Sequence, residues 1–265
     1  MATSAINQVI PMRPNVLSIC LKETKYEFLK CLRLPMYSVS TMVFPIMFYV
    51  LFGLVMGRQN IGNISTTTYL IAAYGTFGVM GASLFGTAAT LATERGFGWL
   101  EVKKATPMPP FAYFLAKVVM SMIFSAIDVL LLLILGAAFG GVHLPPIVTA
   151  KLFLTLVAGS LPFCAMGLAI GYFAGPTSAP AFINVFYLPM SFCSGLWIPF
   201  MFLPKFIQKI AILLPPFHLS QLALGLVGAG NRSSARVHWE ALIGFAMICL
   251  GIALAGHQRD QKANG

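Results

Sequence analysis

The sequence predicts an all-α membrane protein with six transmembrane helices, an N-terminal amphipathic interfacial helix and short re-entrant helices between the fifth and sixth spans. Of its 265 residues, 58% are hydrophobic and only 9% are charged, whereas soluble domains carry about 25% charged residues. Several apolar runs of about 20 residues are long enough to cross a bilayer as helices. Because these runs are continuous and do not alternate with period two, they favour helices over a membrane barrel.

Residues 1–35 are the predicted N-terminal tail and interfacial helix. In residues 16–34, VLSICLKETKYEFLKCLRL, apolar side chains recur at helical spacing and form one stripe. Lys22, Glu23, Lys30 and Arg33 point away from this stripe, so the segment is amphipathic and basic, as helices on a membrane surface are. A short helix packed on other protein is the alternative. Pro35 is expected to end the helix.

Residues 36–256 form the predicted transmembrane domain, and residues 257–265 form a tail. The apolar segments place the six spans at about 36–56, 69–92, 111–139, 148–173, 178–200 and 238–256. Pro45 predicts a kink in the first span. The fifth span contains Pro180, Pro189 and Pro199, which predict an irregular helix.

Two further features of this domain are predicted, a pair of re-entrant helices and a glycine face for helix packing. Residues 201–237 are apolar but interrupted by prolines, and their pieces are too short to cross twice, which predicts two short helices dipping in from the outer face. Three glycines of the fourth span lie four residues apart, and we expect them to share one face that admits a neighbouring helix: Gly167, Gly171 and Gly175.

The distribution of lysine and arginine predicts the orientation. With both termini inside, ten of these residues face the cytosol and six face outward, with Lys117 left inside the third span. We therefore expect both termini to be cytoplasmic in a multi-pass protein of the cell (inner) membrane. The net charge of +10 is spread along the chain, so it indicates contact with the lipid bilayer and not with nucleic acid.

The sequence contains no pattern of an enzyme. Its four histidines are far apart and its five cysteines show no paired spacing, so no metal site is expected. No glycine-rich phosphate loop ending in Gly-Lys-Ser or Gly-Lys-Thr occurs, and the chain is therefore not expected to hydrolyse nucleotide itself or to bind a cofactor.

Two charged residues lie within the third span. Lys117 is near its cytoplasmic end, where the side chain is expected to extend its ammonium group to the headgroups. Asp128 lies eleven residues further on, on the same helix face and roughly 16 Å away. Its carboxyl is either a polar contact between helices or part of a transport path, and the sequence leaves both interpretations open.

Residues 93–110, TERGFGWLEVKKATPMPP, form a charged island between two apolar segments. The whole chain resembles the ABC-2 type exporter permeases in three ordered features. The first feature is the surface helix with the Arg-x-Pro at its end, followed by a first span that ends at Phe52-Gly53. The second is the island itself. The third is the run SGLWIPFMFLPKFIQKIAILLPPFHL before the last span. In the island, the family pattern is matched by Glu94, Arg95, Gly98, Glu101, Thr106 and Pro107, whereas Trp99 replaces the usual threonine.

The resemblance implies a six-span subunit that forms a homodimer or heterodimer and pairs with two copies of a separate ATPase subunit, which binds ATP and Mg. Residues 93–110 would be the coupling helix that contacts this ATPase, with Gly96 and Gly98 allowing a sharp turn and the prolines ending the helix. Complementary contacts are expected from the charged members of the loop: Glu94, Arg95, Glu101, Lys103 and Lys104. The translocation path at the dimer interface would be lined by Phe44, Phe48, Tyr74, Phe77, Phe182, Phe186 and Tyr187.

The function expected from this resemblance is the membrane subunit of an ATP-driven exporter. Its small outer segments favour a lipid, a drug-like molecule or an amphipathic natural product as substrate, with a polysaccharide as the nearest alternative. An ion-coupled secondary transporter that uses Asp128 is the alternative from another class. The sequence does not identify the substrate.

Overall fold

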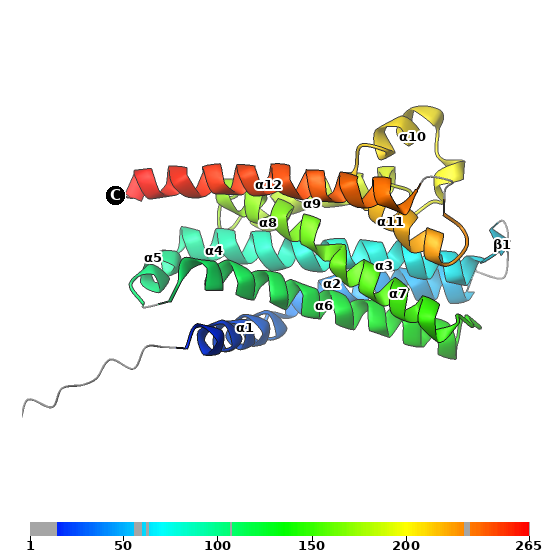
Figure 1. The fold of residues 1–265 in the computed structure, drawn as a ribbon, viewed down its shortest axis with the longest axis horizontal. Helices are drawn as coiled ribbons and strands as arrows, with labels where there is room; N and C mark the ends of the chain where they lie inside the picture. The colour runs from blue at the N-terminus through cyan, green and yellow to red at the C-terminus, as the bar shows by residue number, and fades with distance from the viewer. Residues whose placement is uncertain (1–14, 56–59, 62–63, 107, 231–233, 265) are drawn as a thin grey trace, which may run out of the picture.

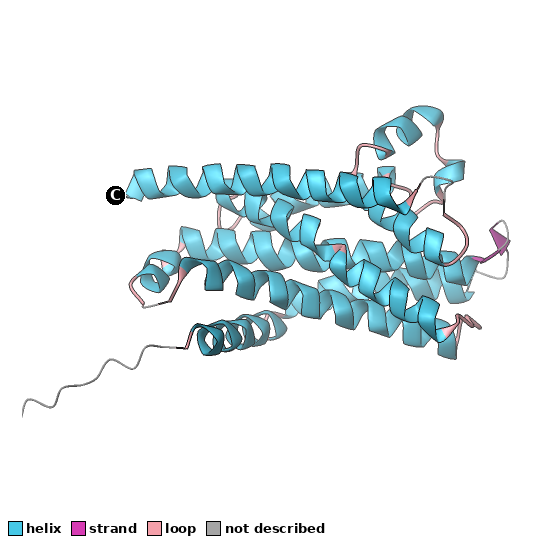
Figure 2. Ribbon diagram, in the orientation of Figure 1, coloured by secondary structure: helices cyan, strands magenta, loops and turns pink. Residues whose placement is uncertain are grey.

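A computed structural model describes residues 15–55, 60–61, 64–106, 108–230 and 234–264. Apart from one hairpin of two two-residue strands, the regular structure of these residues is helical (Figures 1 and 2), which confirms the predicted all-α class. The elements of the first half are α1 (Val16–Leu32), α2 (Pro35–Phe48), the π-helical η1 (Tyr49–Val55), β1 (Asn60–Ile61), β2 (Ile64–Ser65), α3 (Thr66–Leu84), η2 (Phe85–Ala89), α4 (Thr90–Gly96), α5 (Trp99–Lys104) and α6 (Pro110–Ala138).

The second half continues the bundle with shorter helices. Its elements are α7 (Pro146–Ala158), α8 (Ser160–Phe173), α9 (Ala179–Cys193), the 3-10 turn η3 (Phe200–Phe202), α10 (Lys205–Ala211), α11 (Pro215–Leu226) and α12 (Ala235–Asn264). In Figure 1 the long helices run roughly side by side, with α5, α1 and the C-terminus near one end of the bundle. The β1–β2 hairpin and α10 lie at the opposite end (Figure 1).

Five helical segments in the described residues are long and apolar enough to cross a membrane. They are Tyr37–Val55, Thr66–Gly96, Pro110–Ala138, Pro146–Phe173 and Ala235–Lys262, and α10 with α11, bent by 91°, would make a sixth. These bounds agree with five of the predicted spans to within a few residues at most ends. The last helix extends furthest, because α12 continues through most of the predicted tail.

The predicted fifth span differs from the helix found there. α9 has 15 residues and ends at Cys193, short of the predicted end at residue 200. Gly195 follows with φ of +78°, a left-handed conformation that glycine adopts without strain. The chain then reaches Pro199, which lies outside the helix at the start of η3.

The centre of the bundle is α3, whose side chains are almost all buried. It packs against α2, α6, α8 and α11. Two of the three glycines predicted on one face of the fourth span lie against η2 and α4, which continue α3. A Cβ on Gly167 would come within 1.9 Å of Thr87 Oγ1, and one on Gly171 within 3.0 Å of Leu91 Cβ. Gly175 lies beyond the end of α8 and meets only Ser178 at 3.1 Å, so the shared face includes two glycines and not three.

Helix α1 packs along α6. Cys20, Glu27 and Cys31 are buried in this contact, whereas Leu17 and Leu21 of the predicted apolar stripe are exposed. The helix therefore has a protein-facing side that includes a buried carboxylate, and a second, apolar side that remains open.

Candidate functional site

The charged island at residues 93–110 folds as a helix end, a tight turn and a short helix. α4 ends at Gly96, the chain turns through Phe97 and Gly98, and α5 follows. Gly98 has φ of +75°, so the turn requires glycine there. Gly96 is helical and has another role than the predicted turn, because a Cβ at this position would come within 2.5 Å of Pro176 Cγ. Pro110 begins α6, as expected of proline at a first helical position.

Six charged side chains from four helices meet directly behind this turn, and we call them the charge network. Its members are Glu23, Glu27 and Lys30 of α1, Glu94 of α4, Lys103 of α5 and Lys117 of α6. Lys103 Nζ lies 2.6 Å from Glu23 Oε1 and 3.1 Å from Glu27 Oε1. Lys30 bridges Glu27, at 2.7 Å, and Glu94. Three acids balance three bases, so the network is neutral as a whole.

Lys117 is the deepest member of the charge network. Its side chain is fully buried, with Nζ 3.0 Å from Glu94 Oε2 and 3.3 Å from Glu27 Oε2. It also donates a hydrogen bond to Thr90 Oγ1 at 2.9 Å. The prediction that Lys117 extends to the headgroups is therefore wrong: two glutamates within reach satisfy the ammonium group inside the protein, and α1 and α4 cover it.

Tyr113 closes the network on the α6 side. Its hydroxyl donates to Glu94 Oε2 at 2.5 Å. Lys103 and Lys117 place their ammonium groups 4.7 Å and 4.8 Å from the centre of its ring, within the range of a cation–π contact. Each oxygen of the buried Glu94 carboxylate thus has a partner, which removes most of the cost of burying this charge.

The charges on α1 and α5 keep one another ionised. Burial alone would raise the pKa of Glu27, but the surrounding lysine ammonium groups, led by Lys117, outweigh it and hold this pKa below its ordinary value. Burial alone would also lower the pKa of Lys30 and of Lys103, yet the neighbouring glutamates raise both above the ordinary lysine value. Glu27, Lys30 and Lys103 therefore stay charged around neutral pH.

A second polar contact, which we call the Arg95 latch, ties the same loop to the C-terminal helix. Arg95 Nη1 lies 3.0 Å from Asp260 Oδ1 of α12. The same guanidinium donates to the backbone carbonyls of Tyr172 and, at 2.9 Å, of Ala174. The latch thus joins the end of α4 to both α8 and α12.

The outer side of the loop has a different character. Phe97, Trp99 and Val102 are 64%, 60% and 58% exposed, and Glu101 is exposed beside them. We call Phe97, Trp99 and Val102 the apolar tip. Thr106 is also exposed and caps the end of α5 through a 2.6 Å hydrogen bond to the Lys103 carbonyl. Pro107 and the side chain of Lys104 lie outside the described part of the structure.

Of the charged residues predicted to contact a partner, Glu94, Arg95 and Lys103 are engaged within the chain. Helix α1, which supplies partners of Glu94 and Lys103, was predicted as an interfacial helix. A signal was present, because Glu23, Glu27 and Lys30 follow one another at i, i+4 and i+7 on one helix face. Tyr113 and Asp260 had no signal in the sequence, since their roles depend on tertiary packing.

The aromatic residues predicted to line a path fall into two groups. Phe48 is central to the first: its ring centre lies 6.4 Å from that of Phe44, 6.1 Å from that of Tyr74 and 6.4 Å from that of Phe77. Phe77 in turn stacks on Tyr187 at 4.8 Å. Trp197, which was not predicted, joins this group 4.6 Å from Phe48.

The second group is a pair on α9, Phe182 and Phe186, with ring centres 5.5 Å apart. Both rings are exposed, as is Phe44 on α2, whereas Tyr74, Phe77 and Tyr187 are buried. The predicted residues are thus partly core and partly surface, and the exposed ones lie on α2 and α9.

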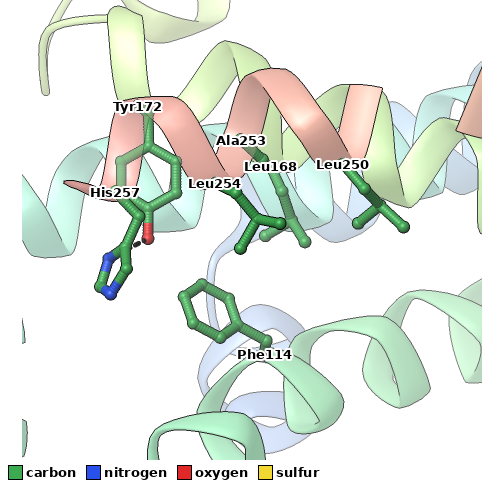
Figure 3. A pocket seen from close by; sticks show the side chains of 7 residues that line it. All are labelled: Phe114, Leu168, Tyr172, Leu250, Ala253, Leu254 and His257. Atoms are coloured by element: carbon green, nitrogen blue, oxygen red, sulfur yellow. Dashed lines mark hydrogen bonds between the residues drawn. The ribbon is translucent and has the colours of Figure 1, made fainter. Parts of the chain in front are cut away.

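A cavity of about 190 Å³ lies between α6, α8 and α12 near the Arg95 latch (Figure 3). Its walls are apolar: Phe114, Leu168, Leu250, Ala253 and Leu254, with Tyr172 and His257 at one end. Figure 3 shows the Tyr172 hydroxyl meeting His257, at 3.0 Å from Nδ1. This polar end is the continuation of the latch and not a separate site.

The long apolar helices define a polytopic α-helical membrane protein. The family model of the ABC-2 type transporter matches residues 20–226, and the chain belongs to this family. The chain is also similar to a Bacillus subtilis (strain 168) protein named "Putative transport permease YvfS", with 26% identity over 248 residues. The alignment covers 93% of this chain and all of that protein. The protein is accordingly a membrane subunit of a transporter.

Proposed function

We propose that this chain is the permease subunit of an ATP-driven exporter and that its loop at residues 93–110 docks on a separate ATPase subunit. The observation that supports this is the contrast between the two sides of the loop. The inner side is fixed to α1, α4 and α6 by the charge network, while the outer side presents exposed Phe97, Trp99 and Val102. An exposed aromatic anchor on a rigid base is typical of a protein–protein contact.

The same arrangement would carry movement from the ATPase into the membrane domain. A push on α5 reaches α1 and α6 through Lys103, and α4 through the turn at Gly98. Through the Arg95 latch it also reaches α8 and α12. Because close-packed elements move as bodies, a shift of this loop would be transmitted to most of the bundle. ATP and Mg would be bound by the partner alone.

The proposal also gives the permease an orientation in the membrane and a second permease as partner. The end of the bundle with α5, α1 and the C-terminus (Figure 1) would face the cytosol, in the cell (inner) membrane. The exposed apolar sides of α2 and α9 would meet a second permease, identical or similar, and each of the two would carry one ATPase. The substrate would be a lipid, a drug-like or amphipathic natural product, or a polysaccharide.

The experiment compares two exposed aromatic residues, Trp99 at the start of α5 and Phe139 directly after the end of α6. Trp99→Ala removes the centre of the apolar tip, whereas Phe139→Ala removes a side chain that is 74% exposed at the far end. We expect Trp99→Ala to weaken assembly with the ATPase subunit about thirtyfold, as the loss of an interface hot spot of about 2 kcal/mol does. Transport and permease-stimulated ATP hydrolysis in proteoliposomes should fall with it.

Phe139→Ala should leave both assembly and transport unchanged. Normal ATPase assembly in Trp99→Ala would overturn the docking proposal. Transport that proceeds without any ATPase subunit would instead favour the ion-coupled alternative that uses Asp128.

A further inference from the structure

Asp128 belongs neither to the charge network nor to the Arg95 latch. It lies in the middle of α6 with its side chain fully buried. Neither carboxyl oxygen has a hydrogen-bond partner in the part of the chain that the structure describes. The carboxyl fills the space above a glycine of α3: a Cβ on Gly78 would come within 1.7 Å of Asp128 Oδ2 and within 3.1 Å of Pro45 Cγ on α2.

None of the described residues around this carboxyl brings it a positive charge. Tyr187 of α9 interacts with it electrostatically, but the tyrosine hydroxyl donates to the Phe77 carbonyl at 3.2 Å. α2 and α3 present Pro45 and Gly78. Lys117 is roughly 16 Å away along α6, with its ammonium group bound to glutamates.

An ionised carboxylate at this place would be an unpaired charge in the apolar core of a membrane protein, which is costly. A metal cation would need several oxygen ligands, and the nearby polar group on the same helix is the single Ser125 hydroxyl, one turn away, buried and itself without a partner among the described residues. We propose that Asp128 is a proton-binding site: the carboxyl is a neutral acid while α2, α3, α6 and α9 are packed around it.

This site has a consequence for transport that rests on the proposed function. If α2 and α9 move apart from α3 and α6 when the permease opens, water reaches the carboxyl. The acid then gives its proton to water and becomes a solvated carboxylate, and the proton returns when the helices close. The closed form holds one proton more than the open form, so lower pH favours the closed form.

The chain allows a direct measurement, because Asp128 and Asp260 are its two aspartates. The full-length permease, purified and returned to lipid bilayers, is labelled with ¹³C at the aspartate side-chain carboxyl carbons. Infrared and solid-state NMR spectra then contain two labelled carboxyls. Asp128→Asn and Asp260→Asn each remove one of them and so assign both, and Asp260, paired with Arg95, is the matched control.

We expect the Asp128 carboxyl to give the signal of a protonated acid at neutral pH and Asp260 to give that of a carboxylate. The Asp128 signal should not change when sodium is replaced by potassium or when calcium is removed. A carboxylate signal from Asp128 at neutral pH, or one that depends on the cation, would overturn the proposal. The measurement uses no ATPase, so failure of the docking proposal leaves its outcome unaffected.

Discussion

Lys117 shows how a charge is accommodated inside this bundle. Burying an ammonium group is unfavourable unless it is paired and hydrogen-bonded. Here two carboxylates, the Thr90 hydroxyl and the Tyr113 ring surround it. The side chain joins α1 to α4 within the protein, so its removal would affect folding as well as the position of the loop.

We expect Lys117→Met to destabilise the permease by about 3–5 kcal/mol, because Glu27 and Glu94 would lose their buried counter-charge. The measurement is denaturant unfolding of the purified protein in mixed micelles. Lys151→Met is the matched control, since Lys151 is exposed on α7 and its replacement should change stability little.

Adding Glu27→Gln to Lys117→Met should recover part of the loss, since one unpaired charge is removed. If Lys117→Met were as stable as Lys151→Met, the charge network would not hold the loop.

Part of this site was predictable from sequence alone. The loop's position between two spans and its turn at Gly98 follow from local pattern. The partners of Glu94 and Arg95 do not, because Lys117, Tyr113 and Asp260 lie between 19 and 165 residues away along the chain from the groups they meet. The long side chain of Lys117, near a helix end, could also reach either the lipid headgroups or a buried carboxylate. The packing of α1 and α4 over α6 decides for the carboxylate.

Among the elements, the packing of α8 against the α3–α4 helix depends on glycine. Gly167 faces Thr87, whose hydroxyl is itself fixed by a 2.7 Å hydrogen bond to the Ser83 carbonyl. The two backbones therefore approach closely at a point where the Thr87 side chain cannot move aside. Close approach at small residues is a main source of helix association in membranes.

We expect Gly167→Ala to destabilise the permease by about 1–3 kcal/mol, because the added methyl group overlaps Thr87. Gly251→Ala on α12 is the control: nothing lies within 4 Å of a Cβ there, and alanine should leave stability equal or up to about 1 kcal/mol higher. Thermal unfolding of the two variants compares them directly. Equal losses in both would contradict the close contact.

The helices themselves were largely predictable, and their ends were not. Continuous apolar runs located five spans, since length and hydropathy alone decide them. α9 is shorter than predicted because the chain turns at Gly195, in a left-handed conformation, before the apolar run ends. α12 departs in the other direction, since its polar last turns are held by contacts of Asp260 and His257 with α4 and α8.

For the whole molecule, one end of the bundle gathers α1, α5 and the C-terminal turns of α12 (Figure 1). The charge network and the Arg95 latch are both at this end, and between them they contact α1, α4, α5, α6, α8 and α12. A force applied to the apolar tip would therefore act on most of the membrane domain at once. Our central claim is therefore the proposal that residues 93–110 are where a separate ATPase subunit would move the permease.

Site-specific photo-crosslinking tests this claim most directly. A photoreactive phenylalanine derivative replaces Trp99 in one sample and Phe139 in a second, each in the permease assembled with its purified ABC ATPase subunit. We expect a covalent product with the ATPase from position 99, strengthened or weakened by ATP, and none from position 139. A product from position 139, or none from position 99 in an assembled complex, would contradict the account.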